Sequence, residues 1–106
     1  MNPSNVQTAV PIPYDALRGF CERHHIVRLW LFGSVLRDDF RADSDIDVLV
    51  QFDPNAVPGW EFYGAWTSEL EAILGHPVDL GTPDSLRSWI KPHVMANAQV
   101  VYERPE

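Results

Sequence analysis

The chain has one cysteine, one lysine and no long hydrophobic run. Cys21 has no second cysteine to pair with, so an internal disulfide is excluded and we expect the thiol to be a buried, small apolar group. The longest apolar runs, such as residues 29–32 and 48–50, have three or four residues, far fewer than a membrane span requires. The N-terminal segment lacks a basic patch followed by an apolar stretch, so it does not resemble a secretory signal. We therefore expect a cytoplasmic protein without a membrane partner.

Basic side chains are also scarce. Eight Lys and Arg residues stand against fifteen Asp and Glu residues, which gives a formal net charge of −7. Such a charge repels the phosphate backbone at long range, so we expect no direct nucleic-acid binding. It suits either a chain that gathers divalent cations or one that docks on a basic protein.

The length of 106 residues is typical of one domain with one hydrophobic core. The hydrophobic fraction of 45% and the charged fraction of 22% are ordinary for a globular protein. Residues 1–12 include Pro3 and Pro11 and show no periodicity, which predicts a flexible N-terminal tail. We expect residues 13–106 to form the domain, with no separate acceptor-binding domain.

The spacing of apolar residues alternates between helical and strand patterns. Helices are predicted by the three- and four-residue steps, and strands by short β-branched or alternating runs that end at turn residues. The expected order is a helix over 13–25, a strand over 26–32, a helical turn over 34–39, a strand over 45–52, a helix over 60–74, a strand over 77–81, a short helix over 86–90, a proline-started turn to 98 and a strand over 100–103. This pattern predicts an α/β fold, a small sheet covered by helices.

The most informative segment is residues 31–50, LFGSVLRDDFRADSDIDVLV. Gly33 permits a tight turn after a strand, and Ser34 offers a hydroxyl and a backbone N–H at the start of a helical turn, so the pair suits a phosphate. After a spacer of ten residues, Asp45 and Asp47 lie two positions apart on a strand, so both carboxylates project from one face. Neither pair alone is specific, but their joint occurrence between two apolar strands indicates an active site.

Asp79 is a third carboxylate that we expect in this active site. Asp79 is the polar member of an otherwise apolar short strand, Val78 to Leu80. Three clustered carboxylates raise one another's pKa unless a cation neutralises them, and hard oxygen donors suit Mg2+. A phosphate-binding turn beside a carboxylate trio that can carry two Mg2+ ions is what phosphoryl or nucleotidyl transfer requires. A solvated residue on an edge strand is the structural alternative for Asp79.

With this motif the chain resembles the nucleotidyltransferase domains of the DNA polymerase beta superfamily, and its brevity matches the minimal nucleotidyltransferase (MNT) branch. The resemblance runs from about residue 13 to residue 103. It implies a small mixed sheet with helices, in which Asp45, Asp47 and Asp79 hold Mg2+ and a nucleoside triphosphate. The Gly33-Ser34 pair would contact the phosphates.

Arg37 is a further candidate for phosphate binding. It lies three residues after Ser34, where MNT proteins often carry an Arg-Gly pair, and one helical turn would bring it back toward the phosphates. In this chain the next residue is Asp38 rather than glycine. The departure changes both the turn and the local charge.

The resemblance also implies an activity and a partner. The activity is Mg2+-dependent transfer of AMP from ATP to a hydroxyl, with release of pyrophosphate and with Asp79 as a candidate general base. MNT proteins are commonly encoded beside a HEPN-domain ribonuclease toxin, for which the MNT member is the antitoxin. The implied acceptor is a tyrosine or similar hydroxyl of that toxin, within a hetero-oligomer. Two alternatives stay open: an antitoxin that acts by binding alone, and a small-molecule nucleotidyltransferase that acts as a homodimer.

Other candidate residues have ordinary structural interpretations. Cys21, His24 and His25 resemble half of a metal site, but no second half with ligand spacing follows, so zinc is not expected. Lys91 could reach a triphosphate, although a solvated lysine is the commoner outcome. The four tryptophans at positions 30, 60, 66 and 89 are expected in the core or an interface, with Trp60 the most exposed.

Overall fold

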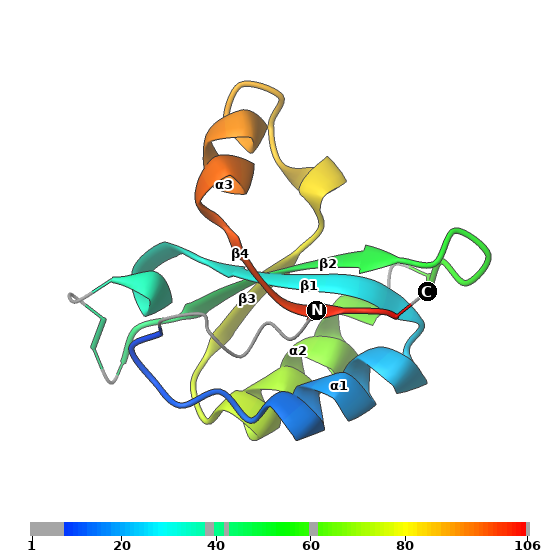
Figure 1. The fold of residues 1–106 in the computed structure, drawn as a ribbon, viewed down its shortest axis with the longest axis horizontal. Coiled ribbons are helices and arrows are strands. Elements are labelled where there is room, and N and C mark those ends of the chain that lie inside the picture. Colours follow the sequence, from blue (N-terminus) through cyan, green and yellow to red (C-terminus); the bar gives the residue numbers. More distant parts are fainter. Residues whose placement is uncertain (1–7, 38–39, 42, 60–61, 106) are drawn as a thin grey trace.

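The computed structural model describes residues 8–37, 40–41, 43–59 and 62–105, and its centre is a four-stranded sheet in the order β3-β2-β1-β4 (Figure 1). Strand β1 is antiparallel to both β2 and β4, whereas β2 and β3 are parallel. The strands are β1 (Ile26–Phe32), β2 (Ile46–Phe52), β3 (Val78–Gly81) and β4 (Gln99–Glu103). A small mixed sheet with helices confirms the expected fold class.

Two helices, α1 (Tyr14–Arg23) and α2 (Phe62–Leu74), cover one face of this sheet (Figure 1). Their apolar residues recur at helical spacing and pack against the side of β2 that bears Ile46, Val48 and Val50. Helix α2 also provides the crossover that a parallel pair such as β2 and β3 requires. The fully or nearly buried core residues contributed by the two helices are Leu17, Phe20, Cys21, Trp66, Leu70 and Leu74.

The opposite face of the sheet carries shorter elements. A 3-10 turn, η3 (Pro83–Ser85), and helix α3 (Lys91–Asn97) rise from it, on the side away from α1 and α2 (Figure 1). Gly81 makes the close approach of η3 possible, since a Cβ there would lie 3.2 Å from Ser85 Oγ and 3.5 Å from Leu49 Cδ2. The second 3-10 turn, η2 (Gly33–Leu36), directly follows β1.

Most expected elements are confirmed, and several shift at their ends. The strand over 26–32 has the expected bounds, whereas the strand expected from 45 begins at Ile46 and the helix expected over 13–25 spans Tyr14–Arg23. The helix over 60–74 is confirmed from Phe62, because residues 60 and 61 lie outside the described residues. The helical turn expected over 34–39 is η2, with residues 38 and 39 also outside the described part.

The helix expected over 86–90 is wrong. Thr82 caps a helical turn, with a reciprocal capping box to Ser85, but the turn is η3 and it ends when Leu86 becomes extended (φ −78°, ψ 142°). The helix lies later, at α3, where a turn was expected. Pro92 stands in its first turn, where the missing N–H costs no hydrogen bond.

Residues 8–12 lie against the domain. The Ala9 N–H donates a 2.7 Å hydrogen bond to the Val35 carbonyl, and Val10 and Ile12 pack on the core. Residues 1–7 of the expected tail are outside the described residues. Among the helices of the described chain, none has the length and apolar character that spanning a bilayer demands.

Candidate active site

Asp47 and Asp79 are neighbours across the parallel pair of strands. The register pairs Asp47 with Asp79, and it pairs the flanking Val48 with Leu80. Because side chains alternate along a strand, both aspartates project from the face opposite α1 and α2, while Val48 and Leu80 enter the core. The apolar pattern of both strands therefore aims two carboxylates at one place.

Two hydrogen bonds hold the start of β3 in this register. The Ile46 N–H donates to the Pro77 carbonyl at 2.8 Å, and the Val78 N–H donates to Glu71 Oε2 at 3.0 Å. Glu71 belongs to α2, so the crossover helix itself fixes the strand that carries Asp79.

Asp45 comes immediately before β2 and is exposed, whereas Asp47 is half-buried. The pKa of Asp47 is raised to about 6, first because burial removes water from the carboxylate, and then because Asp79 and Asp45 repel its negative charge. The structure thus brings the three aspartates into electrostatic contact, with Asp47 as the most affected member.

Gly33 closes the site from the β1 side. It follows Phe32, which is the register partner of Asp47, and it has a left-handed backbone with φ +79°. A Cβ at this position would overlap Oδ2 of the Asp47 carboxylate. Glycine is therefore required twice, by its backbone angle and by the closeness of the carboxylate.

Ser34 and Arg37 lie at the two ends of the turn that follows. Ser34 is half-buried in η2, and its carbonyl accepts a 2.9 Å hydrogen bond from the Arg37 N–H, which closes the turn. The positive charge of Arg37 lowers the pKa of Asp47, in opposition to the stronger effects of burial and the other aspartates. Arg37 is thus electrostatically coupled to the carboxylates, as the one-turn spacing predicts, while Asp38 is outside the described residues.

The donor set fits a hard divalent cation. Three carboxylates supply oxygen ligands, and the pKa of Asp47 is raised by burial and then by repulsion from the other two, a repulsion that a cation would relieve. Within the described ranges, no three His, Cys, Asp or Glu side chains are gathered tightly enough to form a complete metal cluster. The strands therefore supply the ligands side by side, and a shared ion would still have to draw the carboxylates together.

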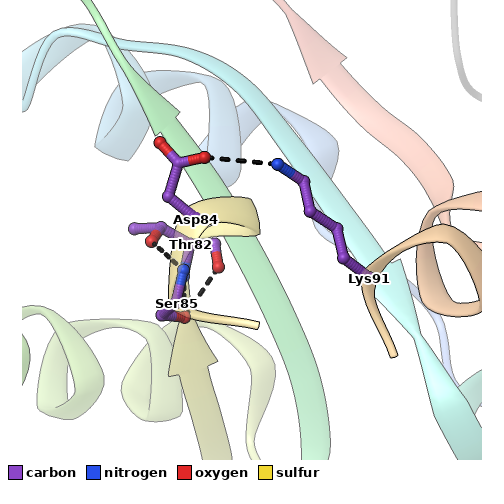
Figure 2. Close-up of polar contacts among 4 residues, drawn as sticks. All are labelled: Thr82, Asp84, Ser85 and Lys91. Carbon is purple, nitrogen blue, oxygen red and sulfur yellow. Dashed lines mark hydrogen bonds and ion pairs between the residues drawn. The ribbon is translucent and has the colours of Figure 1, made fainter. Parts of the chain in front are cut away.

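The other candidates from the sequence lie elsewhere. Cys21 is fully buried in the core, as expected, and burial is the first cause that raises the pKa of its thiol to about 12. His24 Nε2 lies 2.9 Å from Glu69 Oε1, so this ring links α1 to α2. Lys91 forms an ion pair with Asp84, with 3.2 Å between Nζ and Oδ1 (Figure 2).

Sequence reasoning missed two features around the site. One is the contact of Gly33 with Asp47, which requires knowledge of the strand pairing. The other is Gly81, whose small size lets η3 fold over the carboxylate-bearing face. A glycine at the end of a strand, just before the Thr82-Pro83 cap, was the available signal.

Comparisons with known proteins agree with this geometry. Residues 14–105 match the family model described as nucleotidyltransferase domain. The chain is 37% identical over 81 residues to protein adenylyltransferase MntA of Thermococcus cleftensis. This match covers 76% of this chain and 78% of that relative. A relative from Methanocaldococcus jannaschii, also named for protein adenylyltransferase activity, is 37% identical over 67 residues, 63% of this chain and 67% of its own length.

Solved structures share the fold. A structure described as a minimal nucleotidyltransferase superposes with a TM-score of 0.65 at 33% identity, covering 80% of this chain and 85% of that one. A toxin-antitoxin structure with AMP-PNP superposes with a TM-score of 0.63 at 20% identity, covering 88% of this chain and 75% of that one, which shows a shared fold. These findings confirm the expected nucleotidyltransferase activity: the chain belongs to the nucleotidyltransferase domain family.

Proposed function

We propose that this chain transfers AMP from ATP to a hydroxyl of a partner toxin and so acts as the antitoxin of a toxin-antitoxin pair. The observation that carries the proposal is the pairing of Asp47 with Asp79 beside the Gly33-Ser34 turn. The names of the relatives support the reaction, because two of them are named for protein adenylyltransferase activity. The toxin-antitoxin structures of the same fold support the kind of partner.

In this proposal Asp45, Asp47 and Asp79 would hold two Mg2+ ions. Bound Mg2+ supplies charge neutralisation and Lewis-acid polarisation of the phosphate oxygens. The clustering of carboxylates supports a retained metal function, since uncompensated like charges cost stability when no cation is present.

The phosphate side of the site is the η2 turn. The backbone at Gly33 and the hydroxyl of Ser34 bind phosphate oxygens, and Arg37 neutralises part of their charge. The acceptor hydroxyl oxygen forms a bond to the α-phosphorus, and the bond from that phosphorus to the leaving pyrophosphate breaks. Asp79 takes the hydroxyl proton as general base, which balances the step.

The acceptor comes from a second protein. In-line transfer requires an oxygen within about 3.5 Å of the phosphorus and opposite the leaving group. Beyond its one sheet, the described chain holds only short elements on the carboxylate face (Figure 1). This geometry favours a second protein as the source of the acceptor, and the family resemblance implies that it is a tyrosine of a HEPN-domain ribonuclease toxin in a cytoplasmic hetero-oligomer.

The test is co-expression of this chain with a candidate HEPN-domain ribonuclease toxin, followed by intact-mass spectrometry of the toxin. The proposal expects the mass of one or more AMP groups on the toxin, and none when the chain carries Asp47→Asn. An unmodified toxin that is fully inhibited by both the wild-type chain and the Asp47→Asn variant would show neutralisation by binding alone. Transfer of AMP to small molecules, with none to the toxin, would instead support the homodimeric alternative.

A further inference from the structure

Residues 82–98, called here the arm, stand apart from the core. The arm contains η3, a turn over 88–90 and α3, and it rises from the carboxylate-bearing face of the sheet, yellow to orange in Figure 1. No residue of the arm is buried. Its apolar side chains therefore gain little from packing within this chain.

Two exposed side chains distinguish the arm. Trp89 is 74% exposed, whereas Trp30 and Trp66 are each 7% exposed. Arg87 is also exposed, and among the residues that the structure describes it forms no ion pair. Tryptophan and arginine are the side chains most enriched among residues that dominate binding energy at protein interfaces.

The turn that carries Trp89 is held in place by contacts within this chain. The Arg87 carbonyl accepts 2.9 Å hydrogen bonds from the N–H groups of both Ile90 and Lys91. Figure 2 shows that Lys91 reaches back to Asp84 in η3, with 3.2 Å between Nζ and Oδ1.

The base of the turn is fixed as well. Thr82 and Ser85 bond reciprocally, with Ser85 N–H donating to Thr82 Oγ1 at 3.2 Å and Thr82 N–H donating to Ser85 Oγ at 3.1 Å (Figure 2). A preformed surface loses less conformational entropy on binding, so an anchor on this turn binds more tightly than one on a loose loop.

We propose that the arm is the docking element for the toxin, with the Trp89 indole seated in an apolar pocket of the toxin and Arg87 paired with a carboxylate at its rim. This inference rests on the proposed function, which supplies a protein partner. The charge distribution supports an acidic rim: Arg87 and Lys91 against Asp84 give the arm a formal charge of +1 within a chain of −7.

The position of the arm suits the chemistry. It begins directly after β3, and Gly81 lets η3 lie against Leu49 on the face from which Asp47 and Asp79 project. A toxin held by the arm is therefore brought to the face where the acceptor hydroxyl is needed. Docking on α1 or α2 would place it on the opposite side of the sheet (Figure 1).

The test measures the dissociation constant between the purified chain and the HEPN-domain ribonuclease, together with AMP transfer. Trp89→Ala and Arg87→Glu should each weaken binding by at least about tenfold. Val57→Ala is the matched control, because Val57 is an apolar side chain that is 66% exposed in the loop after β2. The control should bind as the wild type does, and all three variants should keep the wild-type melting temperature, since the changed side chains are exposed.

The outcomes separate the arm from the catalytic proposal. Weaker binding by the arm variants, with full binding by Asp47→Asn, supports the arm even if no AMP transfer is found. Wild-type binding by Trp89→Ala and Arg87→Glu overturns the arm and leaves catalysis intact. If Trp89→Ala instead dissociates a homodimer and leaves toxin binding unchanged, the arm contacts a second copy and the proposal is wrong. If the wild-type chain does not bind the toxin, both proposals are overturned.

Discussion

The Gly33 backbone lies so close to the Asp47 carboxylate that a Cβ on Gly33 would overlap Oδ2. The glycine also has φ +79°, a region that side-chain-bearing residues rarely adopt. The turn that we assign to the phosphates and the carboxylate that we assign to the metals are thus one packed unit. Substitutions can separate the requirement for a left-handed backbone from the requirement for space beside the carboxylate.

Gly33→Ala should lower the free energy of unfolding by more than the roughly 1–2 kcal/mol expected for a left-handed alanine alone. Gly75→Ala is the matched control, because Gly75 has φ +73° and a Cβ there meets nothing within 4 Å. Urea denaturation of both variants measures the difference. An equal decrease in the free energy of unfolding for Gly33→Ala and Gly75→Ala would contradict the contact with Asp47. AMP transfer should fall only in Gly33→Ala.

Asp45→Asn and Asp47→Asn should each reduce AMP transfer by orders of magnitude while the fold is retained, because the amide keeps the shape but removes the charge that holds Mg2+. Ser34→Ala should cost about tenfold, the value of one hydrogen bond to a charged phosphate. The measurement is transfer of labelled AMP to the toxin, with circular dichroism as the control for folding. Unchanged transfer in both aspartate variants would remove these residues from the mechanism.

Without divalent cations, the raised pKa of Asp47 predicts a specific dependence of stability on pH. The folded chain binds this proton more tightly than the unfolded chain does, so the free energy of unfolding should fall as pH rises from about 4 to about 6. The comparison is wild type against Asp47→Asn, denatured with urea in EDTA across this range. Other groups titrate in both proteins, so only the difference between them reports Asp47. A difference that is independent of pH would contradict the shift.

Mg2+ with ATP should raise the melting temperature, because the ligands bind the folded carboxylate cluster only. The rise should be larger at pH 8 than at pH 5, since metal ligands must be ionised and the pKa of metal-free Asp47 is about 6. Differential scanning fluorimetry at both pH values gives the measurement, with Asp47→Asn as the control. No rise at either pH, in the chain or in its complex, would contradict the nucleotide site.

Cys21 should be unreactive in the folded protein. Its thiol is fully buried, and burial raises its pKa to about 12, so almost no thiolate exists near neutral pH. A chromogenic disulfide reagent should label it slowly under native conditions and rapidly in urea. Fast native labelling would mean that α1 opens locally from the sheet.

Elements and motifs that are determined by residues close together in the sequence could be predicted. The strand over 26–32 follows from a β-branched and aromatic run that ends at glycine, and the Gly33-Ser34 and Asp45-x-Asp47 motif is local. The end of η3 at Leu86 was not predictable from spacing, because the apolar spacing of residues 86–90 favours a helix, whereas the backbone at Leu86 is extended. The ion pair of Asp84 with Lys91 depends on how the turn between them closes, which no periodicity encodes.

The register between β2 and β3 connects catalytic alignment to hydrophobic burial. A slip of one residue along β3 would turn Asp79 into the apolar interior and expose Val78 and Leu80 to water. The burial energy of two aliphatic side chains, roughly 1.5–3 kcal/mol each, therefore opposes any misplacement of the third carboxylate. The chain should consequently accommodate one residue inserted between Gly75 and Val78 only by forming a bulge. The length of this short connection therefore sets the register of β3 against β2, and with it the alignment of the site.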